Sequence, residues 1–542
     1  MAAVVATTLE VARDAAELLP IDYEAEDHDV ALRADHPGLY TPRRVNPNYP
    51  ADSVIGEPDD AWAAAPVRID ATYETPAQHN HPMEPHTTVA RWDGDHLTLW
   101  DSNQGVSRVQ PVLAAAFGLE RRQVTVISEH VGGGFGSKGT PRPNAILAAL
   151  AARVVDRPVK LAVPRTQMPA VVGHRTPTIQ RLRLAADADG ALASISHEVV
   201  EYTSTIHEYA EQTAVGTRHL YAAPHRRTTH RLVALDVPTP SWMRAPGECP
   251  GSFGIECAMD ELAIAAGIDP VELRIRNEPD VDPESGKPFS SRNLVACLRE
   301  GAARFGWDER DPRPGVRREG RWLVGTGVAS SLYPARAVAS RAYAEAGEDG
   351  RLAVGIAASD IGTGARTAIG LVAAEALGVA PSEVEVRIGV SDLPPAMIAG
   401  GSLGMSSWAW AVDLACRDLR RQLDEHGGRA PAGGLTARSD TKAAIAGLDD
   451  VARFSFGAQF AEDGGAGRAD PPSPRARGRA LRARMDRAQP AAVRALVVRV
   501  AVSKLGDVEL VPQLPVGGVR QHIGADLPPG FDFVPHRLRI LL

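Results

Sequence analysis

The sequence predicts an α+β protein with several subdomains, and three observations lead to this prediction. The chain has 542 residues, more than one domain usually contains. Strand-like alternation and helical periodicity follow one another along it without a strict repeat. Hydrophobic residues make up 44% and charged residues 23%, which is typical of folded proteins and argues against a largely disordered chain.

The first part of the chain predicts a helix, a linker and a hairpin. Residues 1–25 contain a strand end and an amphipathic helical pattern, as at the end of a domain. Residues 26–66 are rich in Pro, Asp and Gly, a composition that indicates a long linker. Apolar and polar residues alternate in 67–73 and 87–100, and an Asp-Gly pair predicts a turn inside the second stretch.

The next elements are a strand, a glycine-rich loop and a helix. The sequence predicts them at 123–131, 132–139 and 144–155, and it predicts further helices at 253–267 and 366–378. No stretch approaches the roughly 18 uninterrupted apolar residues of a membrane span. We also expect two large domains, at 67–310 and 320–462.

Residues 463–542 differ from the rest of the chain. They hold 13 basic and 7 acidic side chains, with Arg scattered on no consistent face, whereas the whole chain carries a net charge of −8. The part that precedes them is therefore acidic, which argues against nucleic acid as a partner.

The four cysteines exclude two kinds of site. They form no CxxC pair and are too few for a disulfide framework or for an iron–sulfur cluster of recognisable spacing. A redox centre would therefore come from a bound organic cofactor or from a partner.

The strongest local motif is the glycine-rich loop Val131–Gly139. Its glycines permit positive φ and bare backbone close to an anionic group. Gly134-x-Gly136-x-x-Gly139 matches the dinucleotide fingerprint, so an NAD(P)-binding dehydrogenase is the alternative function. Pro141 and Pro143 weaken it, because they separate the loop from the helix that should lie under a pyrophosphate.

A cluster of histidines offers a second alternative, a zinc hydrolase. His79, His81, Glu84 and His86 lie close together in the sequence. The prolines between them exclude the helix that an HExxH zinc site needs, so polar residues at a strand end remain the simpler interpretation.

Several motifs occur in an order that resembles a known family. The chain is similar to the molybdenum-binding large subunit of the xanthine dehydrogenase/aldehyde oxidase family, and most similar to its bacterial separate-subunit aldehyde oxidoreductase branch. The motifs are MEPH at 83–86, NQ at 103–104, GGGFGSKG at 132–139, MRAPG at 243–247, MDELAIAAGIDPVELRIRN at 259–277, DIGTGART at 360–367 and AEALGV at 374–379.

The resemblance implies a multi-subdomain molybdopterin-binding fold and a set of cofactor contacts. Gln104 would donate a hydrogen bond to an oxo ligand of molybdenum, Arg244 would contact the pterin, and Arg336 would face the substrate. No protein side chain would ligate the metal. Contacts to the molybdenum ligands, the pterin and the dinucleotide phosphates would come from Gly133, Gly134, Phe135, Gly136, Gly362, Thr363, Gly364, Gly401 and Ser402.

The resemblance also implies the reaction and the partners. In that family a molybdenum-bound hydroxide attacks an aldehyde or N-heterocycle, a hydride moves to a sulfido ligand, and a glutamate acts as base. The cofactor is molybdenum-molybdopterin, in bacteria usually as the cytosine dinucleotide. Electrons leave through a 2Fe-2S subunit and an FAD subunit. We expect a cytoplasmic location, or a periplasmic one if a partner subunit carries an export signal.

The family pattern is incomplete at both ends of this chain. Residues 1–25 resemble only the end of the family's hammerhead domain, and the loop with the catalytic glutamate, GSKGxGE, is missing near the C-terminus. The family-like text ends at Glu462, and the Arg-rich composition after it suggests a shifted reading frame. We expect the chain as written to bind cofactor poorly and to turn over little.

Sequencing the coding DNA across codons 450–475 tests the frame shift. We expect one of the other frames to continue from FGAQFAE into a strand-rich segment that ends in GSKGxGE. If no frame contains that glutamate, this explanation of residues 463–542 is wrong.

Overall fold

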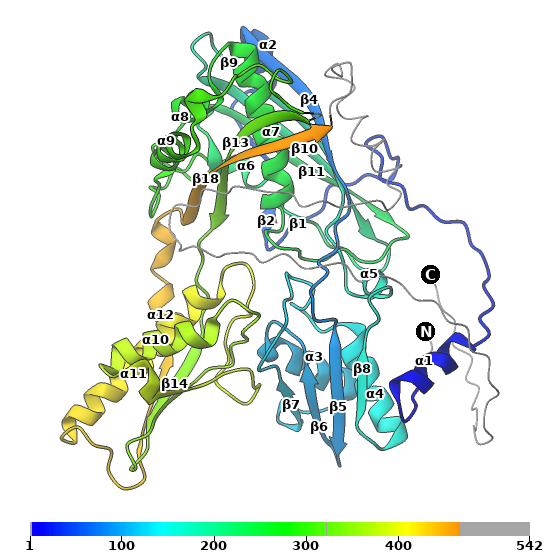
Figure 1. Cartoon of the computed structure of the whole chain (residues 1–542), viewed down its shortest axis with the longest axis vertical. Helices are drawn as coiled ribbons and strands as arrows, with labels where there is room; N and C mark the ends of the chain where they lie inside the picture. The colour runs from blue at the N-terminus through cyan, green and yellow to red at the C-terminus, as the bar shows by residue number, and fades with distance from the viewer. Residues whose placement is uncertain (1–2, 321, 467–542) are drawn as a thin grey trace. The chain divides into compact units, whose positions relative to one another are not determined.

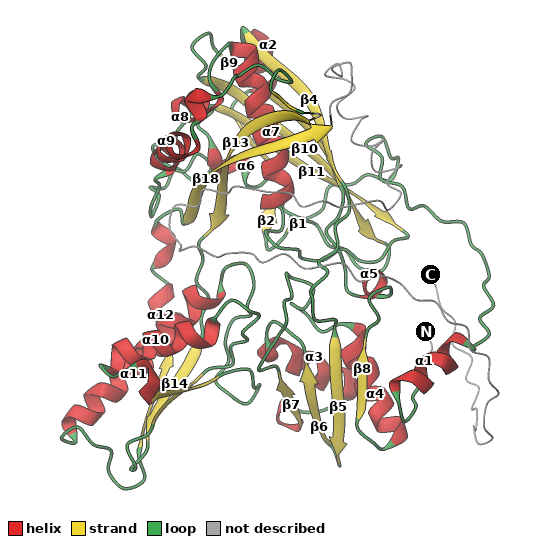
Figure 2. Ribbon diagram, viewed as in Figure 1, coloured by secondary structure: helices red, strands yellow, loops and turns green. Residues whose placement is uncertain are grey.

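The computed structural model describes residues 3–320 and 322–466, which fall into two units, 3–26 and 27–466. The tail predicted from residue 463 therefore lies almost wholly outside the described residues. The first unit contains helix α1 (Leu9–Glu17), whose N-terminus is capped by the hydroxyl of Thr8. In the second unit, helices and strands are mixed throughout, which confirms the predicted α+β class (Figures 1 and 2).

A five-stranded sheet carries the first core of the second unit. Its order is β3-β11-β10-β9-β4, with β10 and β11 parallel and the other neighbours antiparallel. Helix α7 (Glu248–Ala266) packs on β4 and β9. The strands are β3 (Ser53–Ile55), β4 (Val67–Thr75), β9 (Thr178–Ala186), β10 (Leu192–Ser204) and β11 (His225–Leu235).

A second, three-stranded sheet packs near this core. Its order is β12-β13-β18, and the long strands β13 and β18 pair antiparallel from Trp322↔Ala466 to Pro334↔Phe454. Helices α8 and α9 connect it to α7, and residues of α7, α8, α9, β13 and β18 share one apolar core. The elements are β12 (Arg318–Glu319), β13 (Trp322–Pro334), β18 (Phe454–Ala466), α8 (Pro270–Arg276) and α9 (Leu294–Phe305).

Two further four-stranded sheets have the same topology. Each begins with a hairpin, its second strand pairs in parallel with the third, and the fourth pairs with the first from the other side. We call the first of these sheets with its helices subdomain A and the second with its helices subdomain B. Subdomain A contains β5 (Thr87–Asp93), β6 (His96–Asp101), α3 (Val106–Phe117), β7 (Val124–Ile127), α4 (Pro143–Val155) and β8 (Val159–Ala162). Subdomain B contains β14 (Arg341–Ala346), β15 (Leu352–Gly355), α10 (Ala365–Leu377), β16 (Val384–Arg387), α11 (Gly404–Glu425) and β17 (Leu435–Asp440).

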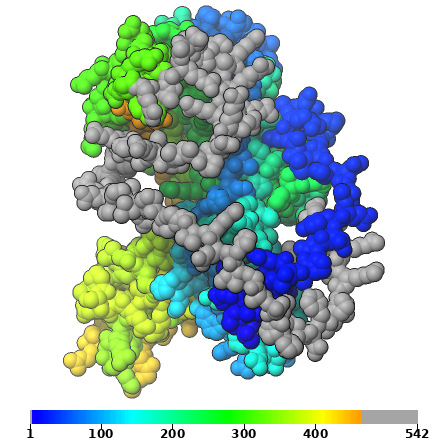
Figure 3. All heavy atoms as spheres, turned by 45° about the vertical axis from the view of Figure 1, so that its right-hand side comes forward, coloured from blue at the N-terminus to red at the C-terminus, as the bar shows by residue number. Residues whose placement is uncertain are grey.

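The two subdomains are also inserted in the chain in the same way. Subdomain A lies between β4 and β9, which pair with each other, and subdomain B lies between β13 and β18, which also pair. Subdomains A and B meet where β7 and β16 end: Ser128 N donates to Gly389 O (2.7 Å) and Ser391 N donates to Val126 O (2.9 Å). Figure 3 shows their surfaces, cyan and yellow-green, next to each other.

The segment 26–66 differs from the predicted linker. It contains the short strands β1 (Arg44–Val45) and β2 (Tyr49–Pro50), strand β3 and helix α2 (Pro58–Ala64), and β3 pairs with β11. Strands of two or three residues are too short to show alternation, so the Pro- and Asp-rich composition hid them. The remaining short helices are α5 (Met168–Val171), α6 (Thr217–Leu220) and α12 (Lys442–Ile445).

The predicted hairpin, loop and helices match the observed elements. Asp93 and His96 close the β5–β6 hairpin, and helices α4, α7 and α10 cover the three helical patterns. The 22-residue helix α11 was not predicted, although its buried side chains lie at helical spacing. No helix in the described part of the chain is both long and apolar enough to cross a membrane.

Buried Arg274 ties the first core together. Its side chain is fully buried and donates to Glu256 Oε2 and Asp260 Oδ1, both at 2.8 Å. Glu256 also accepts from Tyr221 OH (2.6 Å) and from the amide of Ser330 on β13 (2.6 Å). One guanidinium therefore neutralises the carboxylate that joins α7, α8 and β13.

Arg274→Met should destabilise the protein by about 3–5 kcal/mol, because it leaves the buried carboxylate of Glu256 without its counter-charge. Equilibrium denaturation in urea measures this loss. The matched control is Arg417→Met, which removes an exposed ion pair with Asp413 on α11 and should cost less than about 1 kcal/mol. Similar losses in both variants would contradict this role for Arg274.

Candidate functional site

Five loops that the sequence singled out meet inside the second unit. In subdomain A they are the loop between β6 and α3, with Gln104, and the loop between β7 and α4, residues 131–139. The equivalent loops of subdomain B hold residues 360–364 and 398–403. Residues 243–247, before α7, form the fifth. Hydrogen bonds join the four subdomain loops in pairs: Ala399 N donates to Gln104 O (2.7 Å), and Val131 N donates to Asp360 O (3.3 Å).

The glycine-rich loop of subdomain A approaches its neighbours too closely for side chains. A Cβ on Gly134 would lie 2.5 Å from Gln104 Oε1, and one on Gly136 would lie 2.4 Å from Trp242 O. Gly136 also has a φ of +102°, which favours glycine. Phe135 adopts a φ of +52° and is 44% exposed. The loop therefore presents an aromatic ring and bare backbone.

Gln104 is buried and joins loops of both subdomains. Its Oε1 accepts from the amides of Gly136 (2.9 Å) and Lys138 (3.2 Å). Its Nε2 donates to Ala399 O at 2.7 Å and has a second hydrogen left for another acceptor. The structure thus places Gln104 beside the glycine loop and gives it a bridging role that the sequence did not reveal.

An ion pair inside the site joins two of the quoted motifs. Lys138 Nζ, which is buried, lies 2.7 Å from Glu84 Oε2 and 3.1 Å from Glu84 O. The same carboxylate oxygen accepts from Gly132 N at 2.7 Å. Burial lowers the pKa of Lys138, and Glu84 opposes this shift. Glu84 therefore holds both ends of the glycine loop.

The histidine motif has other partners in this structure. Glu84 is engaged by Lys138, and burial lowers the pKa of His86 to about 4, which keeps its ring neutral. Its Nε2 lies 3.2 Å from Ser137 O. In residues 3–320 and 322–466, no three His, Cys, Asp or Glu side chains are arranged to hold a metal ion.

Residues 243–247 contact the glycine loop through backbone atoms. Arg244 N donates to Phe135 O (2.9 Å), and the side chain of Asn80 donates to Phe135 O (2.7 Å) and to Trp242 O (3.2 Å). Arg244 itself is exposed. The sequence identified Arg244, but it gave no signal for Asn80, which lies between the two predicted strands of residues 67–100.

In subdomain B, Asp360 closes the predicted glycine turn. Its carboxylate accepts from the amides of Gly362 (3.0 Å), Gly364 (3.3 Å) and Arg366 (3.1 Å). Gly362 and Gly364 have positive φ, and no atom lies within 4 Å of the positions that their Cβ atoms would take. The turn is therefore open on its outer side, although two of its amides already have an acceptor.

The loop before α11 reaches Arg336. Gly401 and Ser402 have positive φ, at +61° and +53°. Ser406 lies on α11 just after this loop, and its Oγ donates to Arg336 O at 2.6 Å. The guanidinium of Arg336 donates to the hydroxyl of Tyr49 and lies 4.9 Å from its ring centroid. No salt bridge of the described residues includes Arg336, and burial lowers its pKa.

Three glutamates are buried near residues 243–247. They are Glu201, Glu211 and Glu248, with exposed fractions of 1%, 0% and 7%. Burial raises the pKa of Glu211 and of Glu248 to about 7 each, and burial together with the nearby Glu211 carboxyl raises the pKa of Glu201 well above its ordinary value. Arg175 is the one guanidinium that pairs with this cluster in the described chain.

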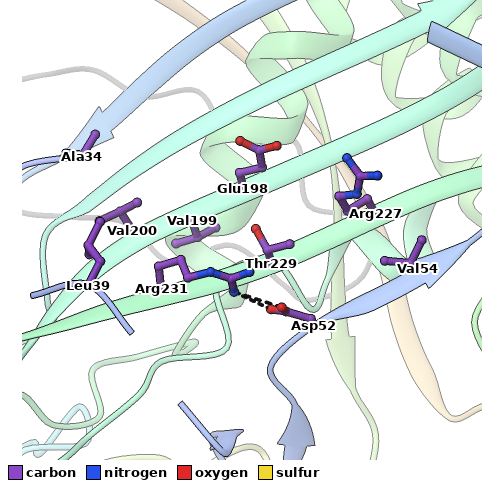
Figure 4. A pocket seen from close by; sticks show the side chains of 10 residues that line it. All are labelled: Ala34, Leu39, Asp52, Val54, Glu198, Val199, Val200, Arg227, Thr229 and Arg231. Carbon is purple, nitrogen blue, oxygen red and sulfur yellow. Dashed lines mark hydrogen bonds and ion pairs between the residues drawn. The ribbon is translucent and has the colours of Figure 1, made fainter. Parts of the chain in front are cut away.

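A separate cavity of about 490 Å³ lies over β10 and β11 (Figure 4). Among its lining residues, Arg231 pairs with Asp52 at 2.9 Å. None of the residues that line it belongs to the five loops, so it is not part of the candidate site.

Comparison with known proteins identifies two domains. Residues 41–278 and 300–465 each match the molybdopterin cofactor-binding domain. Over 425 residues, the chain is 42% identical to the aldehyde oxidoreductase molybdenum-binding subunit PaoC of Escherichia coli (strain K12), with 78% of this chain and 57% of that protein covered. Over 337 residues it is 30% identical to the putative xanthine dehydrogenase molybdenum-binding subunit XdhA of the same organism, with 60% and 44% covered.

A solved structure has a similar fold. The aldehyde oxidoreductase from Desulfovibrio gigas aligns with a TM-score of 0.71 and 25% identity, over 85% of this chain and 54% of that one. The chain thus spans about half the length of the relatives that it matches.

The raised pKa of Glu248 predicts how stability depends on pH. A carboxyl with a native pKa of about 7 and an ordinary one of 4.5 stabilises the fold fully below about pH 4.5, and this stabilisation is lost as pH rises through 7. Glu248→Gln should remove that loss, so its melting temperature should fall less between pH 5 and 8 than that of the wild type, by a few °C.

Thermal unfolding of the full chain at several pH values measures this difference. Glu272→Gln, at an exposed position of α8, serves as the control and should follow the wild type. A Glu248→Gln curve parallel to the wild-type curve would show that Glu248 is ionised in the native protein at pH 5.

Proposed function

The chain belongs to the molybdenum-binding subunits of the aldehyde oxidoreductase and xanthine dehydrogenase family, and on that premise we propose that it binds molybdenum-molybdopterin and oxidises an aldehyde or an N-heterocycle. The observation that carries this proposal is the convergence of the five loops around exposed Phe135 and bare glycine backbone. The PaoC similarity favours an aldehyde.

The residues at the convergence fit such a cofactor. Side chains on Gly134 or Gly136 would collide with Gln104 or Trp242, so backbone atoms form this wall. Gln104 Nε2 has a hydrogen to donate, and Arg244 is exposed beside Phe135. When bound, the cofactor supplies the two-electron acceptor for oxidising an electron-poor carbon.

We assign the roles within the site as follows. Gln104 would donate to an oxo ligand of the metal, Gly133 to Gly136 with Phe135 would lie against the pterin, and Arg244 would contact the pterin. The open outer side of the turn with Gly362, Thr363 and Gly364 supports a place for the phosphates, completed by Gly401 and Ser402. The cytosine dinucleotide is the proposed form of the cofactor.

Arg336 is proposed to face the substrate. Its guanidinium has no carboxylate partner among the described residues and is held by Tyr49. Since a half-buried, unpaired positive charge attracts electron-rich groups, this side chain can orient the carbonyl oxygen or ring nitrogen of a substrate.

The electrons of the reaction need a way out. We propose a 2Fe-2S subunit and an FAD subunit as partners, and a cytoplasmic location unless a partner directs export. The relatives PaoC and XdhA are themselves molybdenum-binding subunits, which supports a multi-subunit assembly.

The chain as written is proposed to be impaired. GSKG occurs once in the sequence, in the first glycine loop, and the glutamate loop of the family is absent. A general base contributes about 10²–10⁴ to the rate, so we expect turnover to be reduced by that order. The NAD(P) dehydrogenase remains the alternative; β7, which precedes the loop, is the edge strand of a mixed sheet rather than a strand of a parallel one.

Metal and pterin analysis of the full chain, produced in a host that makes molybdopterin, tests the proposal. We expect molybdenum and pterin in equal amounts, at less than one per chain, and slow aldehyde oxidation. Gly134→Ala should lower both contents several-fold, because its Cβ displaces Gln104, whereas Gly327→Ala, with open space around it, should not.

The same preparation tests Arg336 and the alternative. Arg336→Met should raise KM and leave the molybdenum content unchanged. Zinc in place of molybdenum, or a stability gain with NAD(P) and none with molybdopterin, would overturn the proposed function. Full occupancy with rapid turnover would overturn the proposed impairment.

A further inference from the structure

Residues 243–247 are held in an unfavourable backbone conformation. Ala245 has a φ of +54° and Gly247 a φ of +76°. A Cβ on Gly247 would lie 2.6 Å from backbone atoms of Gln212, so the loop is pressed against residues 211–213. A non-glycine residue at positive φ is strained and persists only where its surroundings enforce it.

Arg175 enforces this conformation from inside the protein. Its Nη2 lies within hydrogen-bond distance of three consecutive carbonyl oxygens, those of Met243 (3.1 Å), Arg244 and Ala245 (3.2 Å). Its Nη1 donates to Gln78 Oε1 at 2.9 Å. Three carbonyls turned toward one guanidinium fix the direction of the peptide groups between them.

Glu211 completes the arrangement. Its Oε1 lies 3.4 Å from Arg175 Nε and accepts from Gly247 N at 2.7 Å. Both side chains are buried, with exposed fractions of 2% for Arg175 and 0% for Glu211. One buried ion pair therefore holds the loop by hydrogen bonds, at its carbonyls and at its last amide.

The position of the glycine motif depends on the conformation of residues 243–247. Arg244 N donates to Phe135 O (2.9 Å), so the position of Phe135 depends on that of the loop. Neither Arg175 nor Glu211 lies in any of the five loops, and the two are 36 residues apart in the sequence.

We propose that Arg175 and Glu211 are the positioning pair of the cofactor site: together they hold residues 243–247 so that Arg244 and Phe135 face the pterin. This inference rests on the proposed function for the identity of the ligand. That Arg175 and Glu211 hold residues 243–247 rests on the hydrogen bonds alone.

Two substitutions in the full chain separate the pair from general stability. Arg175→Lys keeps the charge but lacks the planar fork whose three nitrogens contact Gln78, the loop carbonyls and Glu211 at the same time. Glu211→Gln keeps an oxygen for the Gly247 amide and removes the charge. The matched control is Arg292→Lys, at an arginine whose side chain is 5% exposed and which pairs with Glu278 at 2.7 Å and donates to the carbonyls of His219 and Leu220.

Two readouts are taken from each variant. Hydrogen–deuterium exchange follows the amides of residues 243–251, which include those of Arg244 and Gly247, and exchange in β10 checks that the variants are folded. The rate of pterin loss is followed by the fluorescence of the released, oxidised pterin. We expect Arg175→Lys and Glu211→Gln to raise exchange in 243–251 at least tenfold and pterin loss several-fold, and Arg292→Lys to match the wild type in both.

Each other outcome has a defined meaning. Unchanged exchange in 243–251, or exchange in β10 that is faster to the same degree, contradicts the inference that the pair holds residues 243–247. Faster exchange with unchanged pterin loss overturns the positioning role. If the wild type holds no pterin at all, the proposed function fails and the positioning role fails with it, while the exchange data still decide whether the pair holds the loop.

Discussion

Reciprocal backbone hydrogen bonds join the ends of β7 and β16: Ser128 N donates to Gly389 O, and Ser391 N donates to Val126 O. The close approach requires glycine at 389, where φ is +82° and a Cβ would lie 2.7 Å from Ser128 O. Because subdomains A and B share one topology, they meet at the ends of corresponding strands, and each loop of one lies against the non-equivalent loop of the other: Gln104 O accepts from Ala399 N, and Asp360 O accepts from Val131 N. The glycine loop, Gln104 and the two turns of subdomain B depend on this junction for their places in the site.

The site is held mainly by buried polar contacts rather than by packing. Lys138 with Glu84 ties down the glycine loop, and Arg175 with Glu211 ties down residues 243–247. Buried charges of this kind are costly unless they are paired, so each pair has few alternative arrangements. This constraint explains how a site made largely of backbone and glycine can have a defined shape.

Much of the fold was predictable because its signals are local. The Asp93-Gly94 turn, the strand before the glycine loop and the helices α4, α7 and α10 were all expected. The short strands of residues 44–55 were not, because strands of two or three residues are too short to show alternation. Helix α11 was missed although its buried side chains lie at helical spacing. Asn80, Arg175 and Glu211 were missed because their partners are distant in the sequence, and no spacing relates Arg175 to the carbonyls that it binds.

The sequence by itself determined the residue types and the order of the motifs, and thereby the family, because glycines at positive φ and turn residues act through their own backbone. It did not reveal that two subdomains repeat one topology, since the repeat lies in the strand connections and not in the residues. Only the tertiary structure decided that Gln104 bridges both subdomains and that burial raises the pKa of Glu211 and Glu248 to about 7. Those properties arise from neighbours hundreds of residues away or from the exclusion of water, and neither exists until the chain has folded.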